Sequence, residues 1–271
     1  YETARAILMS GAEDSNYDVL VQGAGRVNAD KATDIAAGLG SVYTTPDSWS
    51  FGDYRGTVYP GFANILFPGT SSTKTFTVYN TGSTDRVVNI STDRLVKIGE
   101  MNFDWTTAPV SDEGPYEFPQ PDYLRDLTPD IPEGTDLMIV RWTIPMDEFD
   151  PEGDLRWNQR WYGAIYDWTD VNGDGNLWED LDGDGAVDRQ NGEMDEKEAV
   201  LFSYWRPYNI GGQMTVQRPL ERMHDGIYLG LIHRQRSEDI PQTHFKFKVE
   251  FYQHAPWPWL SIEPTSLTVP A

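Results

Sequence analysis

The sequence contains no cysteine among its 271 residues. Disulfide bonds, thiolate metal sites and a cysteine nucleophile are therefore excluded. The compartment stays open, because a secreted protein of this size can rely on its core or on bound ions instead. The sequence also lacks any apolar run near the roughly 18 residues that a membrane-spanning helix needs. We expect no membrane span, and no signal peptide is recognisable, so an export signal would lie upstream or have been removed.

Positive charge is scarce as well. Lys and Arg number 21 against 43 Asp and Glu, which gives a formal net charge of −22 and a pI near 4.3. A field of this sign repels the phosphate backbone of nucleic acids and anionic lipid surfaces. Nucleic acid is therefore excluded as a partner, and cations are the natural ligands.

Two short helices are predicted near the N-terminus. Apolar residues at helical spacing, including Ile7 and Leu8, mark the first. The second follows a plausible N-cap at Asn28, has an apolar face that includes Ile35, and ends at Gly38 or Gly40. Helices of three turns or fewer are not stable alone. We expect this pair to pack against a larger body.

After residue 41 the apolar period changes from 3.6 to 2. Short alternating segments separated by Gly and Pro turns predict an antiparallel β-sandwich, fibronectin type III-like or jelly-roll-like. Aromatic residues make up 13 % of the chain, which suits such strands. The predicted strands lie at 62–67, 74–80, 86–91, 136–144, 160–168, 198–205, 226–233 and 244–254.

This pattern predicts three regions: helices over 1–43, the sandwich over 44–256, and a linker with the first strand of a next domain over 257–271. Two excursions interrupt the sandwich. Residues 93–135 show little periodicity and are expected to form an ordered, irregular insertion. Residues 167–196 form a loop rich in Gly and Asp.

The acidic loop carries the strongest chemical signal. Oxygen-bearing side chains recur on alternate residues, with Gly175 and Gly185 at the sixth position of two successive units. Such oxygens converge on one centre, and the glycine allows a turn that brings a backbone carbonyl into the same shell. Hard oxygen ligands without His or Cys favour Ca²⁺. The predicted ligands are Asp170, Asn172, Asp174 and Asn176 in the first unit and Asp180, Asp182, Asp184, Ala186 and Asp188 in the second.

The loop departs from the EF-hand pattern, because position 12 is Leu181 in the first unit and Asn191 in the second. The overlapping units resemble the tandem Asp loops of dockerins or thrombospondin-type repeats. Glu179, Glu193 or Asp195 could supply the missing carboxylate. We expect one or two structural Ca²⁺ ions; the alternative is an acidic loop without an ion.

Two stretches near the N-terminus, ARAILMSGAED (4–14) and VQGAGRVNADKA (21–32), resemble the end of the catalytic domain of subtilisin-like serine proteases. In that family one helix follows the nucleophile helix, and a Gln-Gly-Ala-Gly loop opens a closing surface helix. The next 210 or so residues resemble, more loosely, the fibronectin type III-like domain that follows. The resemblance implies an extracellular or cell-surface location and an upstream catalytic domain as partner.

The same resemblance implies that the catalytic Asp, His and Ser precede this region, so no residue here is assigned a catalytic role. The one Gly-Thr-Ser stretch ends at Ser71 and leads into a predicted strand rather than a helix. A triad needs a His held by a buried Asp against the Ser. The four histidines, His224, His233, His244 and His254, are all predicted to lie in β segments.

Two other functions remain open at this stage. A glycan-binding or surface-binding module would use the tryptophans near the acidic loop as a stacking platform. A structural subunit of a cell-surface layer or filament would self-associate through the last strand. The tryptophans in question are Trp157, Trp161, Trp168, Trp178 and Trp205.

Overall fold

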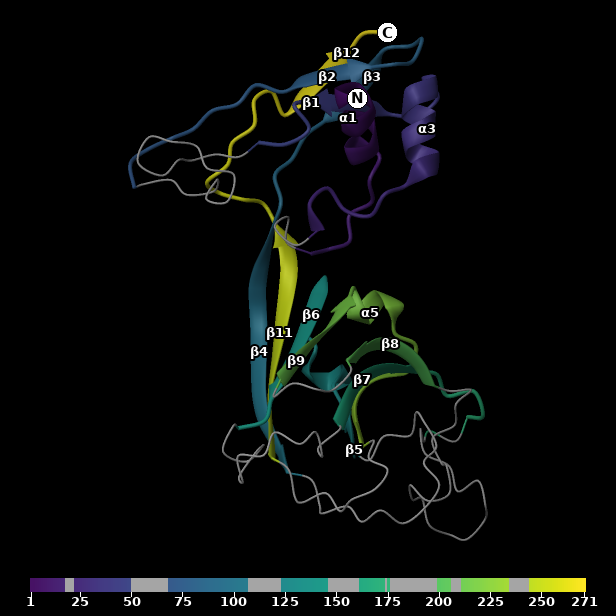
Figure 1. Ribbon diagram of the computed structural model, residues 1–271, viewed down its shortest axis with the longest axis vertical. Helices are drawn as coiled ribbons and strands as arrows, with labels where there is room; N and C mark the ends of the chain where they lie inside the picture. The colour runs from purple at the N-terminus through teal and green to yellow at the C-terminus, as the bar shows by residue number, and fades with distance from the viewer. Residues whose placement is uncertain are drawn as a thin grey trace. The chain divides into compact units, whose positions relative to one another are not determined.

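The computed structural model describes residues 1–17, 22–49, 68–106, 123–145, 161–173, 175, 199–205, 211–233 and 244–271. The described chain is mainly β and antiparallel, with three short α-helices (Figure 1). It forms two compact units. Unit 1 is discontinuous, because it combines Tyr1–Arg94 with Pro256–Ala271, and unit 2 is Leu95–Ala255.

Unit 1 begins with the two predicted helices, α1 (Glu2–Ser10) and α3 (Ala29–Ala37). The predicted ends of α3 are confirmed: the Asn28 side chain accepts the Lys31 amide at 2.9 Å, and Gly38 ends the helix with φ 75°. Burial on both helices is narrow and falls on Ala6, Ala32 and Ile35. The two helices pack against each other, and α1 packs against the first strand of the unit.

Two antiparallel strand pairs complete unit 1. Strand β1 (Val42–Thr45) pairs with β2 (Thr77–Asn80), and β3 (Arg86–Asn89) pairs with β12 (Ser266–Val269). The Asn80 side chain joins the pairs by donating to the carbonyl oxygens of Thr84 at 2.7 Å and Val269 at 3.3 Å. Residues 257–271, predicted to form a linker and the first strand of a next domain, therefore supply strand β12 to unit 1.

The loop between α1 and α3 is closed by its own polar groups. Glu13 and Arg26 exchange both backbone hydrogen bonds at 2.8 Å. The Glu13 carboxylate also accepts from the Arg26 guanidinium at 2.7 Å and from the Asn28 side-chain Nδ2 at 2.8 Å. The Gln22 side chain accepts the Ser15 amide at 2.8 Å. The loop that contains the Gln-Gly-Ala-Gly segment thus provides hydrogen-bond partners for its own backbone and carboxylate groups.

Unit 2 contains two four-stranded antiparallel sheets. The first has the order β5-β10-β7-β8, with strands at Tyr123–Asp126, Gly226–His233, Trp161–Trp168 and Ala199–Trp205. The second has the order β4-β11-β6-β9, with strands at Arg94–Thr106, His244–Ala255, Leu137–Thr143 and Gly211–Gln217. A 3-10 turn at Thr128–Asp130 and helix α5 (Pro219–Arg222) lie between strands.

One hydrophobic core joins the two sheets of unit 2 in a sandwich-like arrangement. It takes alternate residues from β6, β9, β10 and β11, as expected for strands that turn one face to a shared core. Each fully buried apolar side chain of this size contributes about 1.5–3 kcal/mol. The most buried members include Met138, Val140, Trp142, Ile165, Met214, Ile227, Leu229, Leu231, Phe245, Phe247, Val249 and Phe251.

The prediction of an antiparallel, mainly β fold is confirmed, and strands occur at seven of the predicted positions within the described residues. The predicted strand at 62–67 lies outside them. Residues 93–135 differ from the expected irregular insertion, because they contain the thirteen-residue strand β4 and the short strand β5. Strand β9 was not predicted, since GGQMTVQ carries little apolar signal.

We expect Gly25→Ala to destabilise unit 1 more than Gly23→Ala. Both glycines have positive φ, 106° and 63°, but a Cβ at Gly25 would lie 2.1 Å from the Glu13 carbonyl oxygen, whereas at Gly23 it meets nothing within 4 Å. The free energy of unfolding should fall by about 3 kcal/mol for Gly25→Ala and about 1 kcal/mol for Gly23→Ala. Hydrogen exchange of the α1 and α3 amides measures both, and equal losses would contradict the contact.

The stability of unit 1 should also depend on pH through Glu13. Its hydrogen bonds with Arg26 and Asn28 and the nearby Lys31 charge lower the pKa of this carboxyl from 4.5 to about 2. A lowered folded-state pKa gives stability that is present above the unfolded pKa and is lost as pH falls from about 4.5 towards 2. Hydrogen exchange across that range should show the loss in the wild type, and a much flatter profile in Glu13→Gln.

Candidate metal site at the acidic loop

The acidic loop connects the end of β7 to the start of β8. Within it, the structure describes Thr169–Gly173 and Gly175. Two predicted ligands, Asp170 and Asn172, fall in this part. The other seven lie outside the described residues: Asp174, Asn176, Asp180, Asp182, Asp184, Ala186 and Asp188.

The carboxylate of Asp170 organises the first turn of the loop. Its Oδ1 accepts the Gly173 amide at 2.7 Å, and its Oδ2 accepts the Gly175 amide at 3.1 Å. Both glycines are left-handed, with φ 80° and 76°. These are the fourth and sixth positions of the motif, so the backbone turn that the pattern requires is present around the first predicted ligand.

The chemistry of Asp170 fits a hard cation. Its side chain is half-buried, and each carboxylate oxygen accepts one amide, which leaves further acceptor capacity on both oxygens. Oxygen donors of this type suit Ca²⁺ and Mg²⁺, and the larger Ca²⁺ tolerates more ligands and less regular geometry. Asp170 and Asn172 are the described residues that could hold the ion.

A buried carboxylate anchors the stem of the loop. Asp167, the seventh residue of β7, is only 1 % exposed. Its Oδ1 accepts the His224 amide at 2.9 Å, and its Oδ2 lies 2.7 Å from His224 Nδ1. The His224 side chain is itself 62 % exposed.

The residue after His224 reaches the loop directly. Asp225 Oδ2 accepts the Asp170 backbone amide at 2.7 Å, and the Asp225 amide donates to the Trp168 carbonyl oxygen at 2.8 Å. Gly226 then pairs with Trp168 as β10 begins. Trp168, Asp170 and Asp225 therefore join the loop entrance to the turn that precedes β10.

The sequence did not reveal this turn. His224 was expected in a β segment, but it lies between α5 and β10, where it contacts Asp167. A signal was present, because a carboxylate within the apolar strand WYGAIYDW requires hydrogen-bond donors if it is buried. Ser71 is exposed and lies between the turn at 68–69 and β2.

One member of the proposed tryptophan platform can be placed. Trp168 is 9 % exposed and packs edge-on against Tyr228, with ring centroids 5.9 Å apart and planes at 87°. Burial, together with the Asp126 charge, raises the pKa of Tyr228. Trp168 therefore packs inside the fold instead of offering a ring face to a sugar. Nothing is described of the side chains of Trp157, Trp161, Trp178 and Trp205.

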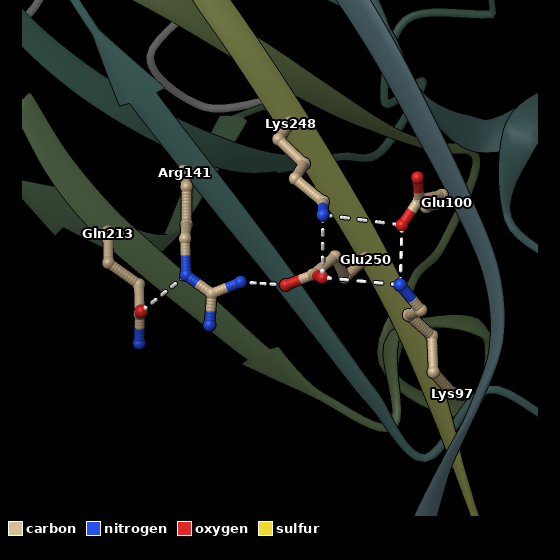
Figure 2. A network of polar contacts seen from close by, with 6 residues as sticks. All are labelled: Lys97, Glu100, Arg141, Gln213, Lys248 and Glu250. Carbon is tan, nitrogen blue, oxygen red and sulfur yellow. Dashed lines mark hydrogen bonds and ion pairs between the residues drawn. The ribbon is translucent and has the colours of Figure 1, made fainter.

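A second polar cluster lies on the other sheet of unit 2 and is built differently (Figure 2). Glu250 on β11 is 7 % exposed at its side chain and contacts Arg141, Lys248 at 3.2 Å and Lys97 at 3.6 Å. Both lysines also contact Glu100, which lowers the pKa of that carboxyl. The cations and carboxylates of this cluster contact one another, so we assign it a role in stability.

We expect Glu250→Gln to lower the free energy of unfolding of unit 2 by about 2 kcal/mol, because hydrogen bonds to a charged group of this burial are lost. The matched change Glu100→Gln, on a carboxylate with 39 % side-chain exposure, should cost clearly less. Urea unfolding followed by tryptophan fluorescence compares the two. A larger loss for Glu100→Gln would contradict the central place of Glu250.

No helix within the described ranges has the length and apolar character required to cross a bilayer. A scan against models of known protein families finds no match to this chain. A search of curated proteins also finds none.

Proposed function

We propose that this chain is a calcium-stabilised accessory region of an extracellular subtilisin-like serine endopeptidase, and that it does not itself carry the catalytic residues. The calcium part of the proposal is supported by the loop entrance. There the Asp170 carboxylate accepts hydrogen bonds from the backbone amides of two glycines in left-handed conformations. The ion has a structural role in unit 2.

The position of the loop supports a structural role. It connects the ends of two neighbouring strands, since Trp168 of β7 pairs with Ala199 of β8. Its many carboxylates repel one another, and each close pair costs about 1 kcal/mol or more. Calcium ions bound among these side chains would replace that repulsion with shared ligands.

The peptidase part of the proposal is supported by the first forty residues. The two family-like stretches fold as α1, a loop closed by Glu13 and Arg26, and α3. Apolar side chains on this region remain exposed, with Leu8 at 44 %, Val27 at 67 % and Leu39 at 75 %. A catalytic domain encoded upstream would offer apolar surface to cover them.

Calcium should raise the melting temperature of the chain. A ligand present at one hundred times its Kd adds about 2.7 kcal/mol of stability, which corresponds to roughly 5–10 °C for a unit of this size. Calorimetric melts in EDTA and in excess Ca²⁺ measure the shift. Asp170→Ala should remove most of it, and Glu133→Ala, at an exposed carboxylate outside the loop, should keep it. Identical wild-type melts in the two buffers would refute structural calcium.

The family assignment has a separate test. Reading the coding sequence upstream of Tyr1 should reveal the catalytic Asp, His and Ser of a subtilisin-like domain in the same frame. A frame without them would overturn the peptidase assignment and leave the calcium proposal standing.

A further inference from the structure

Strand β3 of unit 1 ends in a sequence that N-linked glycosylation recognises. Asn89, Ile90 and Ser91 match the pattern Asn-X-Ser/Thr with a residue other than proline in the middle, and no other asparagine of the chain does. We infer that Asn89 is the attachment site of an N-linked oligosaccharide. The inference rests on the extracellular location in the proposed function, because this modification belongs to exported chains.

The fold leaves the Asn89 side chain accessible. Asn89 is the last residue of β3 and is exposed, and Ser91 two positions later is exposed as well. The side-chain amide of Asn89 makes no hydrogen bond with the part of the chain that the structure describes. Modifying this nitrogen therefore breaks no contact within that part.

Asn89 also lies on an open face of the β3–β12 pair. Val87 shares this face, because alternate residues of a strand point the same way. The register places Thr268 opposite Val87 and Ser266 opposite Asn89, and all four residues are exposed. The buried residue of the pair, Val269, belongs to the other face. An oligosaccharide on Asn89 therefore projects into solvent without displacing a packed side chain.

The surroundings of Asn89 suit a sugar ring. Val87 lies about 7 Å away along the strand, and it is 70 % exposed. The carbon-bound hydrogens of the first sugar can cover this apolar side chain, and the hydroxyl groups of Ser266 and Thr268 can hydrogen-bond to the sugar. Strand β3 is an edge strand of its two-stranded sheet. A bulky, solubilising group at an exposed edge also hinders pairing with another chain.

The reaction joins Asn89 to an oligosaccharide that is carried on a lipid diphosphate. A bond forms between Asn89 Nδ2 and the anomeric carbon of the sugar, and the bond from that carbon to the diphosphate oxygen breaks. Nδ2 loses one proton, and the lipid diphosphate leaves with the bonding electrons. Because β12 is translated long after β3, Asn89 is still without its sheet partner when it becomes available to the transferase.

Secretion of the full chain, behind a signal peptide, from cultured eukaryotic cells tests the inference. Intact mass is measured before and after treatment with peptide-N-glycosidase. The wild type should carry one oligosaccharide, and the enzyme should remove it and convert Asn89 to Asp, which peptide mapping locates. Asn89→Gln and Ser91→Ala should each lose the added mass completely, whereas Ser91→Thr should keep it. Asn102→Gln changes an exposed asparagine outside the pattern and is the matched control, which should keep it too.

The outcomes separate this inference from the proposed function. A secreted wild type without the added mass overturns the inference, and so does an oligosaccharide that persists in Ser91→Ala. If Asn89→Gln is not secreted, Ser91→Ala decides, because it alters one exposed hydroxyl group. Loss of the mass in Asn102→Gln would show a general effect on the fold and overturn the inference as well. The calcium melts are a separate readout, since Asn89 belongs to unit 1 and the acidic loop to unit 2.

Discussion

A carboxylate buried at the end of an apolar strand requires hydrogen-bond donors, and the site depends on how Asp167 obtains them. Its two oxygens take the amide and the ring nitrogen of His224, which fixes the turn before β10 against β7. That turn presents Asp225 to the amide of Asp170. The conformation of the loop entrance is thus set by hydrogen bonds to a turn that lies 55 positions away in sequence.

Local signals predicted a large part of this structure. Phe245, Phe247 and Val249 alternate with lysines, and the strand that they imply is present with these apolar residues buried. The second helix begins at Asn28 and ends at Gly38 because both the cap and the stop are encoded within a few residues. The turn at Asp170 followed from glycine at the sixth position. Each of these features depends on neighbours in sequence.

The features that the sequence did not predict depend on distant partners. The alternating apolar pattern of strand β4 is interrupted by Gly99 and by charged residues. The ion-pair partners of these charged residues include Glu250, which lies on β11. Strand β9 has few apolar residues, and it is placed by its pairing with β6. The contact between His224 and Asp167 spans 57 positions, and no periodicity encodes it. Pairings of this kind become visible only once the sheets are assembled.

The pairing of β3 with β12 has a consequence for biosynthesis. Unit 1 is completed by the last strand of the chain, and the whole of unit 2 is inserted between its two segments. At ribosomal rates, β3 would wait roughly ten seconds or more for its partner to be translated. The inserted unit can bury its core during that interval, so unit 2 is expected to fold before unit 1 is completed.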